Sequence, residues 1–203
     1  MVLSKLKSKK PKVRYLKEMA KVLYDKELPK KAGNFEVYYV WRGVKKYNEL
    51  RYDITLIPPG KLGREFVKTK GNRNWKNFPE LYQVLAGEAI FLLQKGKGKV
   101  VEEVIAIQAK KGDWIVVPPK YAVVMINPSK KILKTGNWVS QKNKNIYWEL
   151  EKMGGACYFA LENPREKKKI QWIKNKNYKI VPKLKFKKSK HIPPENLDFL
   201  KGK

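Results

Sequence analysis

Apolar and polar residues alternate along most of this chain in short runs that glycine and proline interrupt. Runs rich in aromatic and β-branched residues predict strands, and the glycine and proline clusters between them predict turns. The expected strands are 35–41, 52–57, 80–86, 89–94, 100–109, 114–117, 125–127 and 156–161. Gly87-Glu88 and Gly112-Asp113 predict two hairpins, the first joining 80–86 to 89–94 and the second joining 100–109 to 114–117. Many short strands with regular turns are typical of an all-β sandwich or barrel.

The region from Val13 to Leu28 has a helical period instead. Its apolar residues recur at intervals of three and four, which predicts an amphipathic helix ended by Pro29 and Gly33. The expected organisation is therefore a basic arm and helix over 1–31, a barrel over 32–163, and a basic, aromatic extension over 164–203.

Motifs in the barrel region resemble those of one family. The run from Pro59 to Asn74, PGKLGREFVKTKGNRN, is similar to the strand-and-loop entry of the archaeal, cupin-type glucose-6-phosphate isomerases. Further along, Glu80 and Gly87 match the spacing of the first cupin motif. The second motif is matched by Gly112, Pro118 and Asn127. The resemblance covers roughly residues 35 to 163 and implies a cupin fold, the jelly-roll barrel also called a double-stranded β-helix.

The metal ligands that the resemblance implies are mostly replaced. The four matching positions hold Asn72, Asn74, Glu80 and Val123, where the family has three histidines and a glutamate. First-row metals prefer imidazole, thiolate and carboxylate, so this set is a weak one and we expect no metal cofactor. A hard cation such as magnesium on oxygen ligands stays open. The single histidine, His191, and the single cysteine, Cys157, lie far along the chain from both motifs.

The resemblance also implies positions for a substrate. Thr69, Lys70 and Gly71 match the segment that cradles the sugar phosphate, with Arg73 close by. Glu80 matches the family's proposed base, and Tyr82 and Tyr147 match pocket tyrosines. One hypothesis is that these residues are vestiges on a pseudoenzyme. Another is metal-free isomerisation with Glu80 as base and Lys70 or Arg73 stabilising negative charge. The structural alternative is that Glu80 is a buried carboxylate held by Arg73 or a lysine.

The net charge of the chain indicates a further kind of partner. The chain has 47 basic and 18 acidic residues, a net charge of +29, and all but 6 of the basic residues are lysine. Heat adaptation usually enriches Lys and Glu together, but Glu does not keep pace here. Residues 1–31 carry a net charge of +8, residues 164–203 carry +11, and the longer middle carries +10. A polyanion is the simplest partner for such an excess.

Lysines neutralise phosphates, and aromatic rings stack on unpaired bases. The expected RNA-binding residues are Lys5, Lys7, Lys9, Lys10, Lys12, Arg14, Lys167, Lys168, Lys169, Trp172, Lys174, Lys176, Tyr178, Lys183, Lys185, Lys187, Lys188 and Lys190. The alternative for the C-terminal residues is two edge strands that pack their aromatic side chains on the barrel and leave the lysines outside. A DNA-coating role is weaker, because no helix-turn-helix signature is visible.

The sequence thus favours an RNA-binding protein on a non-catalytic cupin scaffold, ribosomal or ribosome-associated, in contact with ribosomal RNA and neighbouring ribosomal proteins. The alternative function is a sugar-phosphate isomerase or a sugar-phosphate-binding protein. One cysteine excludes a disulfide framework within the chain, and no apolar run reaches the length of a membrane span. The charged first twelve residues lack the apolar stretch of a signal peptide. We therefore expect a cytoplasmic protein, with homodimerisation through the barrel left open.

Overall fold

The computed structural model describes residues 10–166 and 169–201. Its strands are β1 (Lys12–Tyr15), β2 (Glu36–Tyr47), β3 (Leu50–Ile57), β4 (Lys61–Leu62), β5 (Glu65–Phe66), β6 (Asn72–Asn74), β7 (Glu80–Ala86), β8 (Glu88–Lys97), β9 (Val100–Lys110), β10 (Trp114–Val117), β11 (Tyr121–Ile126), β12 (Leu133–Ser140), β13 (Asn145–Ile146), β14 (Tyr158–Glu162), β15 (Ile170–Lys174) and β16 (Lys185–Lys188). The short α-helices are α2 (Leu16–Met19), α3 (Leu28–Lys31) and α4 (Trp148–Lys152). The 3₁₀ turns are η1 (Ala20–Val22), η2 (Trp75–Asn77) and η3 (Asp198–Lys201).

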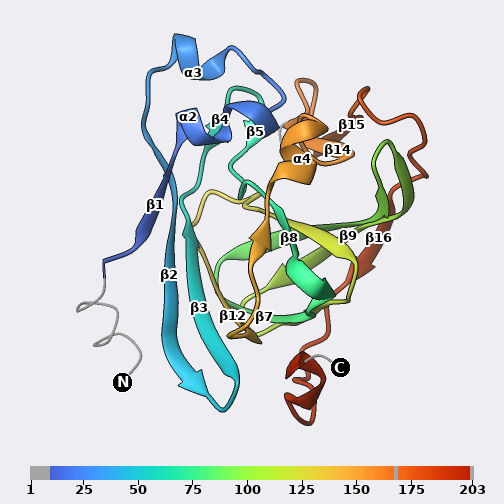
Figure 1. Ribbon diagram of the computed structural model, residues 1–203. Helices are drawn as coiled ribbons and strands as arrows, with labels where there is room; N and C mark the ends of the chain where they lie inside the picture. The colour runs from blue at the N-terminus through green and yellow to red at the C-terminus, as the bar shows by residue number, and fades with distance from the viewer. Residues whose placement is uncertain (1–9, 167–168, 202–203) are drawn as a thin grey trace.

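Two six-stranded sheets form the barrel (Figure 1). One has the order β1-β2-β3-β12-β7-β10 and the other β13-β6-β11-β8-β9-β16. A four-stranded sheet, β15-β14-β5-β4, lies at the end of the barrel that also carries α2 and α4. Neighbouring strands are often distant in sequence, as in β3-β12-β7, which is the arrangement of a jelly roll. The all-β cupin barrel predicted from the sequence is confirmed.

The inner faces of the two sheets fill the barrel with apolar side chains. Phe91, Leu92 and Leu93 of the central strand β8 are buried, and Ile57 of β3 belongs to the same cluster. Burying each such side chain contributes about 1.5–3 kcal/mol. This packing holds the strands that carry the polar residues described below.

The helix predicted over 13–28 is wrong. Residues 12–15 form β1, which pairs antiparallel with β2 and sets Val13 opposite Tyr39. Only one α-helical turn follows, α2, and the 3₁₀ turn η1 comes directly after it. The apolar residues at intervals of three and four are mostly buried, but they do not form a long helix. Leu16 and Met19 pack in the core. An open sheet edge offers backbone hydrogen bonds along its whole length, whereas short helices are marginal by themselves.

Both predicted hairpins are also wrong. Strand β7 lies between β12 and β10, whereas β8 lies between β11 and β9, in the other sheet. In the same way β9 and β10 belong to different sheets. The turns at Gly87 and Gly112 therefore carry the chain from one sheet to the other. A true hairpin joins β8 to β9, and turn residues alone did not reveal which strands pair.

The C-terminal extension adds strands to existing edges. Strand β15 pairs antiparallel with β14, and β16 runs parallel to β9. The rings of Trp172 and Phe186, one from each strand, meet edge to face at 6.1 Å. This is the edge-strand arrangement that the sequence left open. In the described part of the chain, no helix is both long and apolar enough to cross a membrane.

Substitution of Gly87 tests the crossing between the sheets. Its φ is +75°, and an added Cβ would lie 2.4 Å from the carbonyl oxygen of Ile132. We expect Gly87→Ala to lower the free energy of unfolding by about 2–5 kcal/mol, because backbone strain and a backbone clash add. Chemical denaturation measures this loss.

The matched control is Gly33→Ala. Gly33 has nearly the same φ, +74°, but nothing lies within 4 Å of an added Cβ. Only the strain remains, so we expect a loss of about 1 kcal/mol. Equal losses in the two variants would contradict the close approach at Gly87.

Candidate functional site

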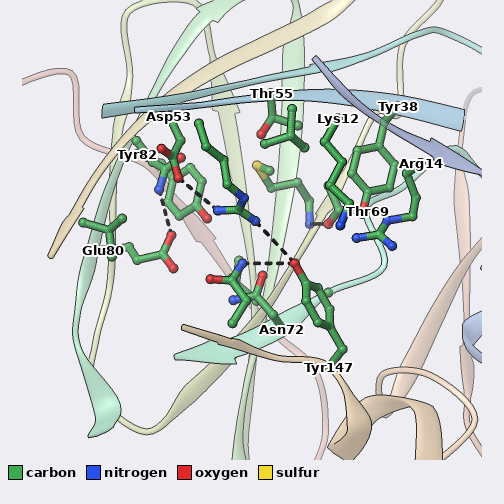
Figure 2. A pocket seen from close by; sticks show the side chains of 18 of the residues that line it. Lys12, Arg14, Tyr38, Asp53, Thr55, Thr69, Asn72, Glu80, Tyr82 and Tyr147 are labelled. Atoms are coloured by element: carbon green, nitrogen blue, oxygen red, sulfur yellow. Dashed lines mark hydrogen bonds and ion pairs between the residues drawn. The ribbon is translucent and has the colours of Figure 1, made fainter. Parts of the chain in front are cut away.

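A small cavity lies inside the barrel, and Figure 2 shows the side chains around it. Its volume is about 50 Å³, whereas pockets for small molecules measure roughly 300–1,000 Å³. The lining residues come from both large sheets and are Lys12, Arg14, Tyr38, Val40, Arg42, Arg51, Asp53, Thr55, Thr69, Gly71, Asn72, Glu80, Tyr82, Val123, Met125, Asn137, Val139, Asn145 and Tyr147. The cavity therefore has a mixed lining, with charged and amide side chains beside the apolar Val40, Val123, Met125 and Val139.

A buried carboxylate, Asp53 of β3, organises one wall. Its Oδ2 accepts hydrogen bonds from Arg42 Nη1 and Arg51 Nε, each at 3.1 Å, and its Oδ1 accepts one from the backbone N–H of Gly43 at 2.7 Å. The β2–β3 register shifts between Trp41 and Lys45, so a bulge lies at this point. Bulges re-aim side chains near functional sites, and this one turns Arg42 toward Asp53.

The same cluster continues to Tyr147. Arg42 Nη2 and Asn145 Nδ2 both lie 3.4 Å from the Tyr147 hydroxyl, as the dashed lines in Figure 2 show. Arg51 Nη1 also donates to the carbonyl oxygens of Ser140 and Asn143. The arginines are thus fixed by several partners each.

Glu80 begins β7 and is buried in the barrel. Its Oε2 accepts a hydrogen bond from Asn137 Nδ2 at 3.1 Å. Burial raises the pKa of Glu80 above its usual range, and the charge of Asp53 adds to this, while hydrogen bonds from Tyr82 and Asn74 oppose it. A carboxyl group with a raised pKa is suited to accept or hold a proton.

Tyr82 shares this environment. Burial and the neighbouring charge of Glu80 raise the pKa of its hydroxyl well above the usual value. Glu80 is not held by Arg73 or a lysine, as one hypothesis had it, because Arg73 pairs with Glu149 of α4. The amide of Asn137 and the phenol of Tyr82 lie beside Glu80 instead.

The four positions that match metal ligands lie close together but do not form a metal site. Asn72, Glu80 and Val123 line the cavity, and Val123 sits directly opposite Asn72 in the β11–β6 pairing. Asn74 is not part of the cavity lining, but its Oδ1 accepts a hydrogen bond from Asn72 Nδ2 at 3.3 Å, and its Nδ2 donates to the carbonyl oxygen of Phe78 at 2.8 Å. Among the described residues no group of three His, Cys, Asp or Glu side chains could hold an ion. One carboxylate beside amides and a valine does not fit a first-row metal.

The segment that matches the phosphate cradle is largely occupied by internal contacts. The Thr69 hydroxyl accepts a hydrogen bond from the backbone N–H of Met125 at 3.0 Å. Lys70 forms an ion pair with Glu151 at 2.5 Å, and Arg73 forms one with Glu149. Helix α4 thus supplies two carboxylates to the two cations of this segment.

Gly71 keeps that segment close to its neighbours. An added Cβ there would lie 2.6 Å from Val124 Cγ2 and 2.7 Å from Leu150 Cδ1. The loop therefore packs tightly between β11 and α4.

Two residues predicted to bind RNA reach the barrel cavity instead. Lys12 and Arg14, both of β1, line it. Arg14 pairs with Glu18 at 2.5 Å and lies 5.5 Å from the ring centre of Tyr147. Lys10 is exposed and lies two residues before β1. The other predicted N-terminal lysines, Lys5, Lys7 and Lys9, and also Lys167 and Lys168, fall outside the described residues.

The predicted C-terminal residues divide into two groups. Tyr178 is buried, and its hydroxyl bonds to Gln94 Nε2 and the Gly155 carbonyl oxygen, each at 3.0 Å, so its prediction as a stacking residue is wrong. Trp172 is half-buried against Phe186. The lysines are all exposed, and this group comprises Lys169, Lys174, Lys176, Lys183, Lys185, Lys187, Lys188 and Lys190. Of these, Lys169 pairs with Glu166 and Lys185 with Glu103.

Sequence reasoning missed Arg42, Arg51, Asp53 and Asn137. A signal was present for Asp53, because a carboxylate in the middle of an apolar strand must find partners when it is buried. Nothing local pointed to Asn137, which meets Glu80 only through the pairing of β12 with β7.

The pH dependence of stability tests the burial of Glu80. A raised pKa in the folded state means that the folded protein binds a proton more tightly than the unfolded chain, so stability falls as pH rises through the window between the two values. We expect Glu80→Gln to stabilise the protein at pH 8 but to change little near pH 4, where a free glutamate is largely protonated. Denaturant unfolding at both pH values measures this. The same difference in the exposed Glu88→Gln control would contradict a specific effect of burial.

Comparison with known proteins identifies the relatives of this chain. The glucose-6-phosphate isomerase (GPI) family matches residues 13–180. A glucose-6-phosphate isomerase from Thermococcus litoralis is 33% identical over 132 residues, which covers 62% of this chain and 67% of the relative. Another, from Pyrococcus furiosus, is 34% identical over 125 residues, covering 58% and 64%. A third, from Thermococcus gammatolerans, is 32% identical over 105 residues, covering 51% and 53%.

Among solved structures, the vicilin of Capsicum annuum covers 53% of this chain and 29% of its own, with 12% identity and a TM-score of 0.41. The Drosophila melanogaster CENP-C cupin domain covers 49% and 65%, with 16% identity and a TM-score of 0.36. Neither likeness carries an argument about function. The family match spans most of the length, and on this match the chain belongs to the glucose-6-phosphate isomerase family.

Proposed function

We propose that this protein binds RNA through its lysine-rich surface, and that the barrel serves as a non-catalytic scaffold. A ribosome or a ribosome-associated RNA is the host that best suits such a protein. The observation that carries the proposal is the set of exposed lysines without acidic partners. Lys176, Lys183, Lys187, Lys188 and Lys190 are exposed and form no ion pair with any described residue.

The location of the cations supports this interpretation. Inside the barrel, Arg42 and Arg51 both form ion pairs with Asp53, which offsets one of their two positive charges. Outside, the surplus lysines face solvent, where mutual repulsion favours a polyanionic partner. Each phosphate neutralised by a lysine releases condensed counterions, and this release drives association with nucleic acids.

The barrel interior supports the non-catalytic half of the proposal. A cavity of about 50 Å³ is far smaller than a typical ligand pocket. Lys70 and Arg73, which would have to bind a phosphate or stabilise negative charge, are engaged by α4. Catalysis would need α4 to release both cations and the cavity to widen.

A second candidate function is binding or isomerisation of a sugar phosphate, as the names of the relatives suggest. One observation favours it: Lys12 and Arg14 bring positive charge to the cavity that holds Glu80. The Nε of Arg14 is buried and has no hydrogen-bond partner among the described residues. A phosphate group would satisfy that donor.

Sedimentation tests the RNA proposal. In a native-source lysate we expect the protein to co-migrate with a ribosomal subunit in moderate salt and to leave that fraction after ribonuclease treatment. With purified RNA, affinity should fall by roughly 10³-fold or more between 50 and 200 mM salt if six or more phosphates are contacted. Migration as a small free protein in both gradients would contradict the proposal.

Metal addition separates the two candidate functions. We expect Mn²⁺ and EDTA to leave the melting temperature unchanged, because the donor set around Glu80 is too weak. The variant Asn72→His/Asn74→His/Val123→His should gain Mn²⁺-dependent stabilisation, about 2.7 kcal/mol at a metal concentration of 100 Kd. The variant Asn72→His/Asn74→His, which keeps Val123, is the control for folding. Stabilisation of the natural chain by Mn²⁺, with turnover of fructose 6-phosphate, would favour the isomerase.

A further inference from the structure

A groove of about 1,000 Å³ lies outside the barrel, between α4, the tip of the β8–β9 hairpin and the segment 176–179. Figure 1 shows α4 and the hairpin at the same end of the molecule. At that volume the groove is at the upper end of the range for ligand pockets.

Hydrogen bonds hold the walls of the groove in place. The backbone N–H of Lys179 donates to the carbonyl oxygen of Lys99 at 2.8 Å, and that of Val101 donates to Ile180 at 2.9 Å. On the other side, Asn177 Nδ2 donates to the Met153 carbonyl oxygen at 3.1 Å, next to α4. The hairpin, the segment and the helix are therefore joined into one surface.

The groove is strongly cationic. Its lining includes six exposed lysines, and within the described part of the chain none of the six forms an ion pair: Lys97, Lys99, Lys120, Lys152, Lys176 and Lys179. The one carboxylate in the lining, Glu149, is paired with Arg73. Because internal acids do not neutralise these lysines, the groove attracts a partner with several negative charges.

An exposed tryptophan lies in the same lining. Trp148 begins α4, and 61% of its surface is accessible, whereas Leu150 and Met153 anchor the helix in the core. An aromatic ring that is left open among lysines presents a face for stacking. Single-stranded nucleic acids are bound by this combination of lysines for phosphates and aromatic rings for bases.

We infer that the groove binds single-stranded RNA, with Trp148 stacked on an unpaired base and the lysines of both walls contacting the flanking phosphates. The inference rests on the proposed RNA-binding function and locates a site for it. A second copy of this chain is a poor occupant, because two such grooves facing each other would oppose their lysines without acids between them. An acidic protein segment shares the charge but gains little from stacking, so it becomes one outcome of the test.

Fluorescence anisotropy with a labelled oligouridylate tests the inference. We expect Trp148→Ala to weaken binding roughly 5- to 100-fold, the range for loss of one stacked base. The variant Lys97→Gln/Lys120→Gln/Lys152→Gln/Lys176→Gln should reduce the slope of log affinity against log salt by about 3, at about 0.7 for each phosphate on a single strand. An RNA duplex should bind more weakly and be insensitive to Trp148→Ala.

Matched controls remove equivalent groups from elsewhere. Trp75→Ala removes another exposed tryptophan, one that does not line the groove. The variant Lys30→Gln/Lys61→Gln/Lys142→Gln/Lys201→Gln removes the same charge from lysines that already have acidic partners. We expect both controls to bind the oligouridylate nearly as the natural chain does.

The possible failures are distinguishable. If the natural chain binds no RNA, the proposed function itself is overturned. If it binds RNA but the groove variants match their controls, RNA binding stands and the groove inference is overturned. If poly-glutamate binds as tightly as the oligouridylate and depends equally on Trp148, the groove is a site for acidic protein segments and the RNA assignment is overturned.

Discussion

Two buried carboxylates in one barrel set the constraint on which the rest of this structure depends. Asp53 and Glu80 both lie inside the barrel, where an isolated negative charge is costly. Arg42 and Arg51 neutralise Asp53. The bulge in β2 lies at Arg42 and directs its side chain toward this carboxylate. Glu80 has no ion-pair partner among the described residues, and burial raises its pKa although the side chains of Tyr82 and Asn74 hydrogen-bond it. The polar wall of the cavity is thus fixed by the need to compensate charge.

That constraint also separates the cations of this chain into two populations. Arginines are the cations that serve the interior, because a guanidinium can satisfy several acceptors at once, as Arg51 does with Asp53 and two backbone carbonyls. Most lysines lie on the exterior without acidic partners, whereas Lys68 is buried beside Glu65 and Lys12 lines the cavity. The weak donor set around Glu80 and the surplus of lysines on the surface therefore concern different parts of the molecule, and a barrel with a narrow interior is compatible with a function on its outer surface.

Membership of the glucose-6-phosphate isomerase family fixes the scaffold more firmly than the chemistry. The strands that carry the family motifs are present and in register, yet Asn72, Asn74 and Val123 offer no metal-ligand set. Helix α4 links the two candidate regions of this protein. Its Glu149 and Glu151 pair with Arg73 and Lys70, and its Trp148 lines the lysine-rich groove.

The sequence by itself determined the all-β class and most strand positions, since alternation and turn residues are local signals. The motif spacing also predicted which residues would occupy the positions that match the family's metal ligands. Of these, Asn72, Glu80 and Val123 line one cavity. Strand pairing was not determined locally: Gly87 and Gly112 look like hairpin turns but cross between sheets. The same holds for Val13 to Leu28, where β1 pairs with the edge of β2 and only short helical turns follow it.

Only the tertiary structure decided the partners of the charged groups. Asn137 reaches Glu80 through β12–β7 pairing, and α4 takes up Lys70 and Arg73, contacts that join residues more than fifty positions apart. The groove around Trp148 likewise combines three distant segments. Lysines are frequent throughout this chain, so their number predicted a polyanionic partner, but which of them share a surface depends on how the sheets are joined.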